Sequence, residues 1–213
     1  MNSPNIKISG LVWLDYVLAG PRRAVKLVKA HKKRYLDPAS MAWSGYEKLF
    51  GAMRQCLNSP DPQATMQGAV AWADARQDWR GPVYRQAADG FLALVAKLPG
   101  RRPTGVKVQQ PQWIEGGLTV TVRNLLGIRL SNGKLLLVAP YCKEPELDQE
   151  SADILLYILE SVVDQALPGA TPVLWDLRRG KAFTLHARAN RPELDVAVRG
   201  LVAKYLTEWD LAA

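Results

Sequence analysis

The segment IRLSNGKLLLV, residues 128–138, decides the fold. Asn132-Gly133 is the strongest short-range signal for a tight β-hairpin turn, because the central positions of such a turn require positive φ angles. Apolar strands flank this turn at 128–130 and 135–138. The second strand is apolar at consecutive positions, a pattern typical of strands that are covered on both faces. We therefore expect this strand to lie inside a sheet.

A helix and two further strands are expected after the hairpin. Asp148 can cap a helix that extends to about Ala166, with apolar residues at helical spacing along one side. Residues 172–176 form a short apolar run that predicts a buried strand, and the chain returns through a second strand at 182–185. Pro192 then opens a final amphipathic helix.

The chain before the hairpin divides at PGRRP, residues 99–103. Beyond this break, residues 106–114 and 118–122 are rich in strand-forming side chains. Before it, the apolar residues follow helical spacing. We therefore expect a basic helical part over residues 1–100 and a sheet-containing part over residues 101–213, joined in one compact unit.

Helix-start signals support this division. Helices are expected over 21–35, which has no internal breaker, and over 82–98. Asp37-Pro38 and Asp61-Pro62 each combine a capping carboxylate with a proline at the first helical position. The predicted fold class is α/β, with a helical N-terminal part, a mixed sheet with an αβββαβ-type core and a C-terminal helix.

The composition is that of a folded, basic protein. Of the 213 residues, 48% are hydrophobic and 23% are charged, which is ordinary for a globular chain. The formal net charge of +8 suits a phosphate-rich partner. A cationic surface that only maintains solubility would give the same charge.

The chain carries the features of a protein from the reducing cytoplasm. Cys56 and Cys142 are far apart and have no partner at zinc-ligand spacing, so free buried thiols are expected. The first apolar stretch is interrupted by Asp15 and followed by Arg22 and Arg23, whereas a secretory signal has its positive charges in front. No apolar run reaches the length of about 18 residues that a membrane span needs, and we expect no membrane association.

Motifs of the common enzyme classes are missing from the sequence. It contains no Gly-rich phosphate loop, no dinucleotide fingerprint and no nucleophile elbow. His31 and His186 are the two histidines, and neither stands at ligand spacing from other metal-binding side chains. Because His31 lies on the apolar side of its helix, we expect a hydrogen-bonded core histidine there. No cofactor and no metal site are expected.

Cationic side chains gather on one side of the 21–35 helix. At about 100° per residue, four of them share a stripe: Arg22, Lys26, Lys29 and Lys33. Residues 1–60 carry ten Lys and Arg against three Asp and Glu, which gives +7 of the net +8. Contacts with phosphates need such clustering, although a solvated helix face has the same pattern. The expected binding residues for nucleic acid, or for an acidic partner protein, are the stripe and the adjacent arginine: Arg22, Arg23, Lys26, Lys29 and Lys33.

The order of elements from about Val106 onward resembles the PD-(D/E)XK nuclease fold. More narrowly, the chain resembles an uncharacterised bacterial family with three shared features. These are an Arg-Arg helix followed by a Tyr-centred helix, a central run of strands that leads to a Tyr before a helix, and a buried strand that ends in Asp. Here they correspond to Pro21-Arg22-Arg23 with Ser44-Gly45-Tyr46, to Val120–Tyr141 with Leu147, and to Val173–Asp176 followed by Arg179-Gly180.

The resemblance implies a metal-dependent nuclease site in which an Asp on one strand meets an acid and a Lys on the next. This chain departs from that pattern, with Asn124 near the first position and Ala139 near the second. A rearranged site could use Glu115, Lys143 and Glu144. Hard cations need converging oxygen ligands, so we expect no catalysis here. Asp176 is expected to cap a turn or to pair with Arg178 or Arg179.

Three functions therefore compete. The first is a non-catalytic nucleic-acid-binding or nucleoprotein-associated protein with a degenerate nuclease-like fold. The second is a protein-interaction module without nucleic-acid binding, with Trp13, Trp79 or Trp113 at its interface. The third is an active metal-dependent nuclease with the rearranged site.

Overall fold

The computed structural model describes residues 6–37 and 45–212. Within these ranges the chain forms seven helices: α1 (Gly10–Val17), α2 (Pro21–Leu36), α3 (Glu47–Cys56), α4 (Pro62–Asp74), α5 (Arg80–Ala96), α6 (Gln149–Ala166) and α7 (Arg191–Leu211). The same ranges contain eight strands: β1 (Ile6–Ser9), β2 (Thr104–Val106), β3 (Gln112–Glu115), β4 (Leu118–Thr121), β5 (Leu126–Arg129), β6 (Leu135–Tyr141), β7 (Thr171–Asp176) and β8 (Lys181–Phe183). The α/β fold class expected from the sequence is confirmed.

The predicted hairpin forms the middle of a five-stranded mixed sheet. Its strand order is β2-β5-β6-β7-β8, with β6 at the centre. Gly133 has a φ of +84°, as expected, and Asn132 Oδ1 accepts a hydrogen bond from the Lys134 amide at 3.1 Å. Asn132 itself does not adopt the positive φ that was expected at both turn positions. Leu137 and Val138 of β6 are fully buried on opposite faces of the sheet. The interior position of this strand is confirmed.

Helix α6 connects β6 to the parallel strand β7, as predicted. Asp148 is its N-cap, with a carboxylate oxygen 2.8 Å from the Ser151 amide. Its apolar stripe packs on the sheet through Leu155, Leu156 and Leu159. The succession α5, β2, β5, β6, α6 and β7 has the αβββαβ order. The hairpin β3–β4 is interposed between β2 and β5.

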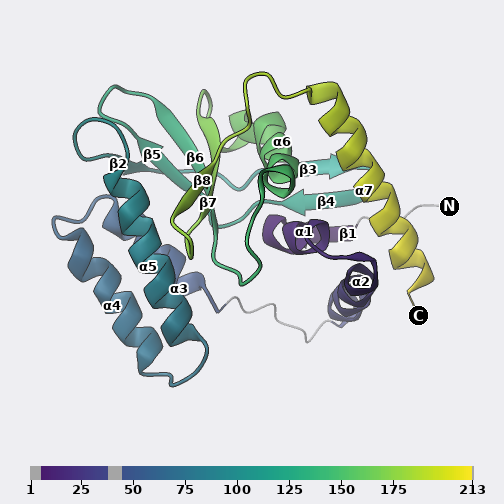
Figure 1. The fold of residues 1–213 in the computed structure, drawn as a ribbon, viewed down its shortest axis with the longest axis horizontal. Helices are drawn as coiled ribbons and strands as arrows, with labels where there is room; N and C mark the ends of the chain where they lie inside the picture. Colours follow the sequence, from purple (N-terminus) through teal and green to yellow (C-terminus); the bar gives the residue numbers. More distant parts are fainter. Residues whose placement is uncertain (1–5, 38–44, 213) are drawn as a thin grey trace.

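The opposite face of this sheet is covered by the helices α3, α4 and α5, which lie together on the left of Figure 1. Phe91 of α5 meets Trp175 of β7 with their ring centroids 6.1 Å apart. Asp61 caps α4 through the Ala64 amide at 2.9 Å, which confirms the Asp61-Pro62 start. The start expected at Asp37-Pro38 lies outside the described residues from Pro38 onward.

A second, three-stranded sheet corrects the expectation that the first hundred residues are helical. Its strand order is β1-β4-β3, and β1 pairs in parallel with β4, Ile6 lying opposite Leu118. The strand expected over 106–114 is also interrupted, because residues 107–111 pass from one sheet to the other. Pro111 lies in that passage and cannot donate a ladder hydrogen bond.

The C-terminal helix α7 closes the second core, at the right of Figure 1. Its buried residues, Val198, Val202, Tyr205 and Trp209, pack with the three-stranded sheet, α1 and α2. Helix α6 lies between the two sheets, and it contributes Ile154 and Ile158 to this second core. Among the described residues, no helix is long and apolar enough to cross a membrane.

Candidate nucleic-acid interface

Helix α2 is held on the protein by one apolar side. Pro21 occupies its first turn, where the missing amide costs no hydrogen bond. Ala24, Val28 and His31 are buried against the second core. His31 lies with Nδ1 3.1 Å from the Tyr205 hydroxyl, so the expectation of a hydrogen-bonded core histidine is confirmed.

A lysine of α2 fixes the helix to the end of α7. Lys32 Nζ donates hydrogen bonds to the carbonyl oxygens of Trp209 at 3.0 Å and Ala212 at 2.7 Å. These carbonyls belong to the last turn of α7, where unpaired backbone oxygens and the helix dipole favour a positive charge. Lys32 therefore has a structural role, because it attaches α2 to the end of α7 in addition to the buried apolar contacts.

The opposite side of α2 is a row of exposed cations. We call it the cationic face; it consists of Arg22, Arg23, Lys26, Lys29 and Lys33, all of which are exposed. Within the described parts of the chain, none of the five forms an ion pair. Like charges at i,i+4 oppose helix formation by about 0.2–0.5 kcal/mol per pair. Repulsion within the row therefore lowers the stability of α2, and an anionic partner would remove that repulsion.

A basic pocket of about 480 Å³ adjoins the C-terminal half of α2. Three cations line it: Lys7 of β1, Arg34 of α2 and Arg123, which follows β4. The sequence does not reveal this set, because the three residues are far apart along the chain. The parallel pairing of β1 with β4 brings them together, and no local pattern in the sequence indicates that pairing.

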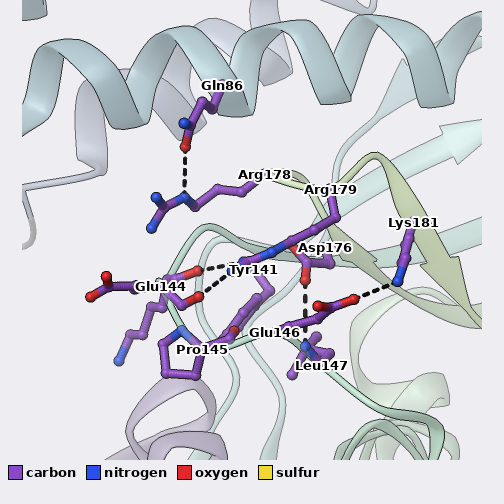
Figure 2. Close-up of polar contacts among 11 residues, drawn as sticks. Gln86, Tyr141, Glu144, Pro145, Glu146, Leu147, Asp176, Arg178, Arg179 and Lys181 are labelled. Atoms are coloured by element: carbon purple, nitrogen blue, oxygen red, sulfur yellow. Dashed lines mark hydrogen bonds and ion pairs between the residues drawn. The ribbon is translucent and has the colours of Figure 1, made fainter.

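A second polar group lies at the ends of the parallel strands β6 and β7, where α/β sheets commonly bind ligands. Figure 2 shows this strand-end cluster around Asp176, whose side chain is fully buried. Its carboxylate accepts from Arg179 at 3.4 Å and lies 3.5 Å from the Leu147 amide. The pairing of Asp176 with Arg179 is as expected, whereas Arg178 instead donates to Gln86 of α5 at 2.9 Å.

The strand-end cluster fastens a loop to the sheet. Arg179 donates to the backbone carbonyls of Lys143, at 2.9 Å, and of Glu144. The Tyr141 hydroxyl donates to the Pro145 carbonyl at 2.6 Å. These contacts hold the segment between β6 and α6 over the strand ends, and they use the polar groups that would otherwise face a ligand.

The residues of the rearranged nuclease site do not come together. Glu115, at the end of β3, forms an ion pair with Arg199 of α7 at 3.0 Å. Lys143 forms an ion pair with Asp15 of α1. The Glu144 carboxylate is exposed and points away from Asp176 (Figure 2). Each of the three candidates thus faces a different neighbourhood.

In the structure, the two positions of the nuclease pattern also have no acidic side chain of their own or on strands β5 and β6. Asn124 has a φ of +60° and donates to Glu47 of α3 at 3.3 Å, while Ala139 is buried in β6. Neither β5 nor β6 carries a carboxylate. Over the described ranges, no three His, Cys, Asp or Glu side chains gather as metal ligands would. Cys56 and Cys142 are buried free thiols.

The tryptophans considered for a protein interface differ in exposure. Trp13 is fully buried in the second core, which rules it out as a contact residue. Trp113 is partly buried against the same core. Trp79 is 50% exposed and lies edge-on to Tyr46, with ring centroids 5.3 Å apart.

No family model matches the sequence, and no curated protein is significantly similar to it. The resemblance to nuclease-like proteins therefore stays a prediction from motif and strand order.

Proposed function

We propose that the protein binds nucleic acid through the cationic face of α2 and does not cleave it. The observation that carries the proposal is the contrast between the two sides of one helix. One side is buried and tied to α7 through His31 and Lys32. The other presents five exposed cations without an ion-pair partner among the described residues.

The length of the face suits a nucleic-acid backbone. From Arg22 to Lys33 the helix rises by about 16 Å, at about 1.5 Å per residue. Phosphates on one strand of duplex DNA follow one another every 3.4 Å or so along the axis, so the face spans about five of them. A rigid helix that is already anchored loses little conformational freedom when it binds.

The composition of the face favours a polyanion over a folded protein partner. Three of its five residues are lysines, which are depleted in the cores of protein–protein interfaces. Aromatic anchors, which dominate the energetics of such interfaces, are missing from it. Phosphate contacts need clustered positive charge and no further motif. An acidic partner protein is the alternative that the experiment below distinguishes.

The two positions at which a nuclease carries its metal-binding carboxylates support the non-catalytic part of the proposal. Asn124 and Ala139 cannot replace the carboxylates of a nuclease, because neither side chain supplies a negatively charged oxygen to a divalent metal. The Asp176 carboxylate already accepts hydrogen bonds from Arg179 and from the Leu147 amide. A cytoplasmic location belongs to the same proposal, and the free thiols are compatible with it.

Charge-neutralised variants test the proposal. We expect Lys26→Gln/Lys29→Gln to weaken binding to duplex DNA, single-stranded DNA or RNA by about tenfold or more at low salt, as measured by fluorescence anisotropy. The matched control is Lys97→Gln/Lys134→Gln, which removes two exposed cations outside α2. Equal losses of affinity in both variants would mean that binding depends on the net charge of the protein and not on the cationic face. Undiminished binding in the α2 variant would refute the assignment of the face.

A further inference from the structure

The basic pocket concentrates positive charge in a concave site. Lys7, Arg34 and Arg123 come from three separate segments and converge on its walls. No carboxylate is among its lining residues, and within the described chain none of the three cations forms an ion pair. Arginine and lysine are the side chains that hold phosphate, arginine with two parallel hydrogen bonds.

Neutral groups on the same walls can recognise more than a phosphate. Gln110, Gln112 and Thr121 supply amide and hydroxyl groups. Tyr35 brings an aromatic ring that is 47% exposed and lies edge-on to Trp209, with centroids 5.5 Å apart. Aromatic side chains held in this way are common stacking surfaces for nucleic-acid bases.

The size of the pocket exceeds what an inorganic anion needs. Pockets for small organic ligands span about 300–1,000 Å³. At about 480 Å³, this one lies inside that range and has room for a sugar and a base beside a phosphate.

His31 contributes to the pocket wall without adding charge. Burial lowers the pKa of its imidazole to about 4, and the nearby cations Arg34 and Lys143 contribute to the shift. The ring is therefore neutral at neutral pH, and Lys7, Arg34 and Arg123 carry the positive charge of the site.

The pocket borders the cationic face along one flank of α2. At about 100° per residue, Arg34 lies within about 20° of Arg23 around the helix axis and about three turns further along α2. A strand lying on the cationic face can therefore pass over this flank and place its end in the pocket.

We propose that the basic pocket binds a nucleotide carrying a terminal phosphate, either free or at the end of a nucleic-acid strand that lies on the cationic face. Arg34, Arg123 and Lys7 hold the phosphate, and Tyr35 faces the base. For the strand end, this inference rests on the proposed function and adds a preference for ends. For the free nucleotide, it stands on the pocket alone.

Anisotropy titrations with end-modified single strands test the strand end. The probe is a short oligonucleotide with a fluorescein on an internal base and with a 5′-phosphate, a 3′-phosphate or hydroxyls at both ends. We expect one phosphorylated form to bind about tenfold more tightly than the hydroxyl form. Arg34→Gln/Arg123→Gln should abolish this preference. Lys26→Gln/Lys29→Gln should weaken all three forms and keep the ratio between them.

Calorimetric titration with adenosine 5′- and 3′-monophosphate tests the free nucleotide. Saturable binding that Arg34→Gln/Arg123→Gln removes would support the pocket even if the wild type bound no oligonucleotide, a result that would defeat the proposed function alone. Binding of all three oligonucleotides with equal affinity, together with no binding of either mononucleotide, would overturn the pocket assignment and leave the proposed function standing. Circular dichroism checks that the variants fold.

Discussion

Acid should destabilise this protein through His31, and replacement of that residue should remove the effect. The imidazole is 9% exposed, is hydrogen-bonded to Tyr205 and has a pKa lowered to about 4, chiefly by burial. In the unfolded chain the pKa of a histidine is about 6.5. Between these two values the unfolded state binds more protons than the folded state, so the free energy of unfolding falls as the pH falls.

The magnitude follows from the two pKa values. At pH 7.5 the contribution of His31 to the pH dependence is close to zero. By pH 5 its protonation in the unfolded chain should lower the free energy of unfolding by about 2 kcal/mol, and by pH 4 by about 3 kcal/mol. Carboxylates also titrate in this range, but they are common to the wild type and the variant and cancel in the comparison.

The assay is urea denaturation followed by tryptophan fluorescence at pH 7.5 and pH 5. His31→Gln keeps a polar group within reach of Tyr205 and cannot be protonated, so it should lose about 2 kcal/mol less than the wild type between the two pH values. The matched control is His186→Gln, at an exposed position, which should behave as the wild type does. Equal losses in the wild type and in His31→Gln would refute the buried, neutral state of His31.

Three further outcomes are expected. Gly90→Ala should lower the free energy of unfolding by about 3 kcal/mol or more in urea denaturation, because its Cβ would lie 1.7 Å from the Leu177 carbonyl oxygen, whereas Gly51→Ala, with open space around it, should be neutral or stabilising. Arg179→Met should destabilise by about 3–5 kcal/mol, since it leaves a buried carboxylate unpaired, and a wild-type melting temperature would contradict the strand-end cluster. The purified protein should not cleave nucleic acid with Mg²⁺ or Mn²⁺ in a gel assay, and cleavage that disappears in Lys143→Ala would reveal an active site.

The central sheet could be predicted because its signals are local. Asn132-Gly133 fixes a turn by backbone geometry, and the apolar run after it has no polar face to leave exposed. Asp148 marks the start of α6 in the same way, through a side chain that bonds an amide three residues on. These features require no knowledge of distant parts of the chain.

Two strands of the second sheet fall in segments expected to be extended, but β1 and its pairing with β4 could not be predicted because that pairing is long-range. Ile6–Ser9 is a four-residue strand, too short for a clear alternation, and its partner Leu118 lies on the far side of the helical part. Pro111 marks the passage between the sheets, but an isolated proline is also compatible with a bulge or an edge strand.

The candidate site divides in the same manner. The cationic face follows from helical spacing, which the sequence displays directly. The basic pocket depends on the pairing of β1 with β4, which brings Lys7 near Arg123, and on the docking of α2 that adds Arg34. A surface on one element can therefore be predicted here, while a pocket between elements requires the structure.

The most direct test of the account is the salt dependence of nucleic-acid binding by the wild type. If Arg22, Lys26, Lys29 and Lys33 each contact a phosphate of duplex DNA, the slope of log affinity against log salt should be about −3.6, or about a 150-fold loss between 50 and 200 mM salt. Lys26→Gln/Lys29→Gln should reduce that slope to about −1.8. A wild type with no salt-sensitive binding to DNA or RNA, or a variant with an unchanged slope, would contradict the claim that α2 binds nucleic acid.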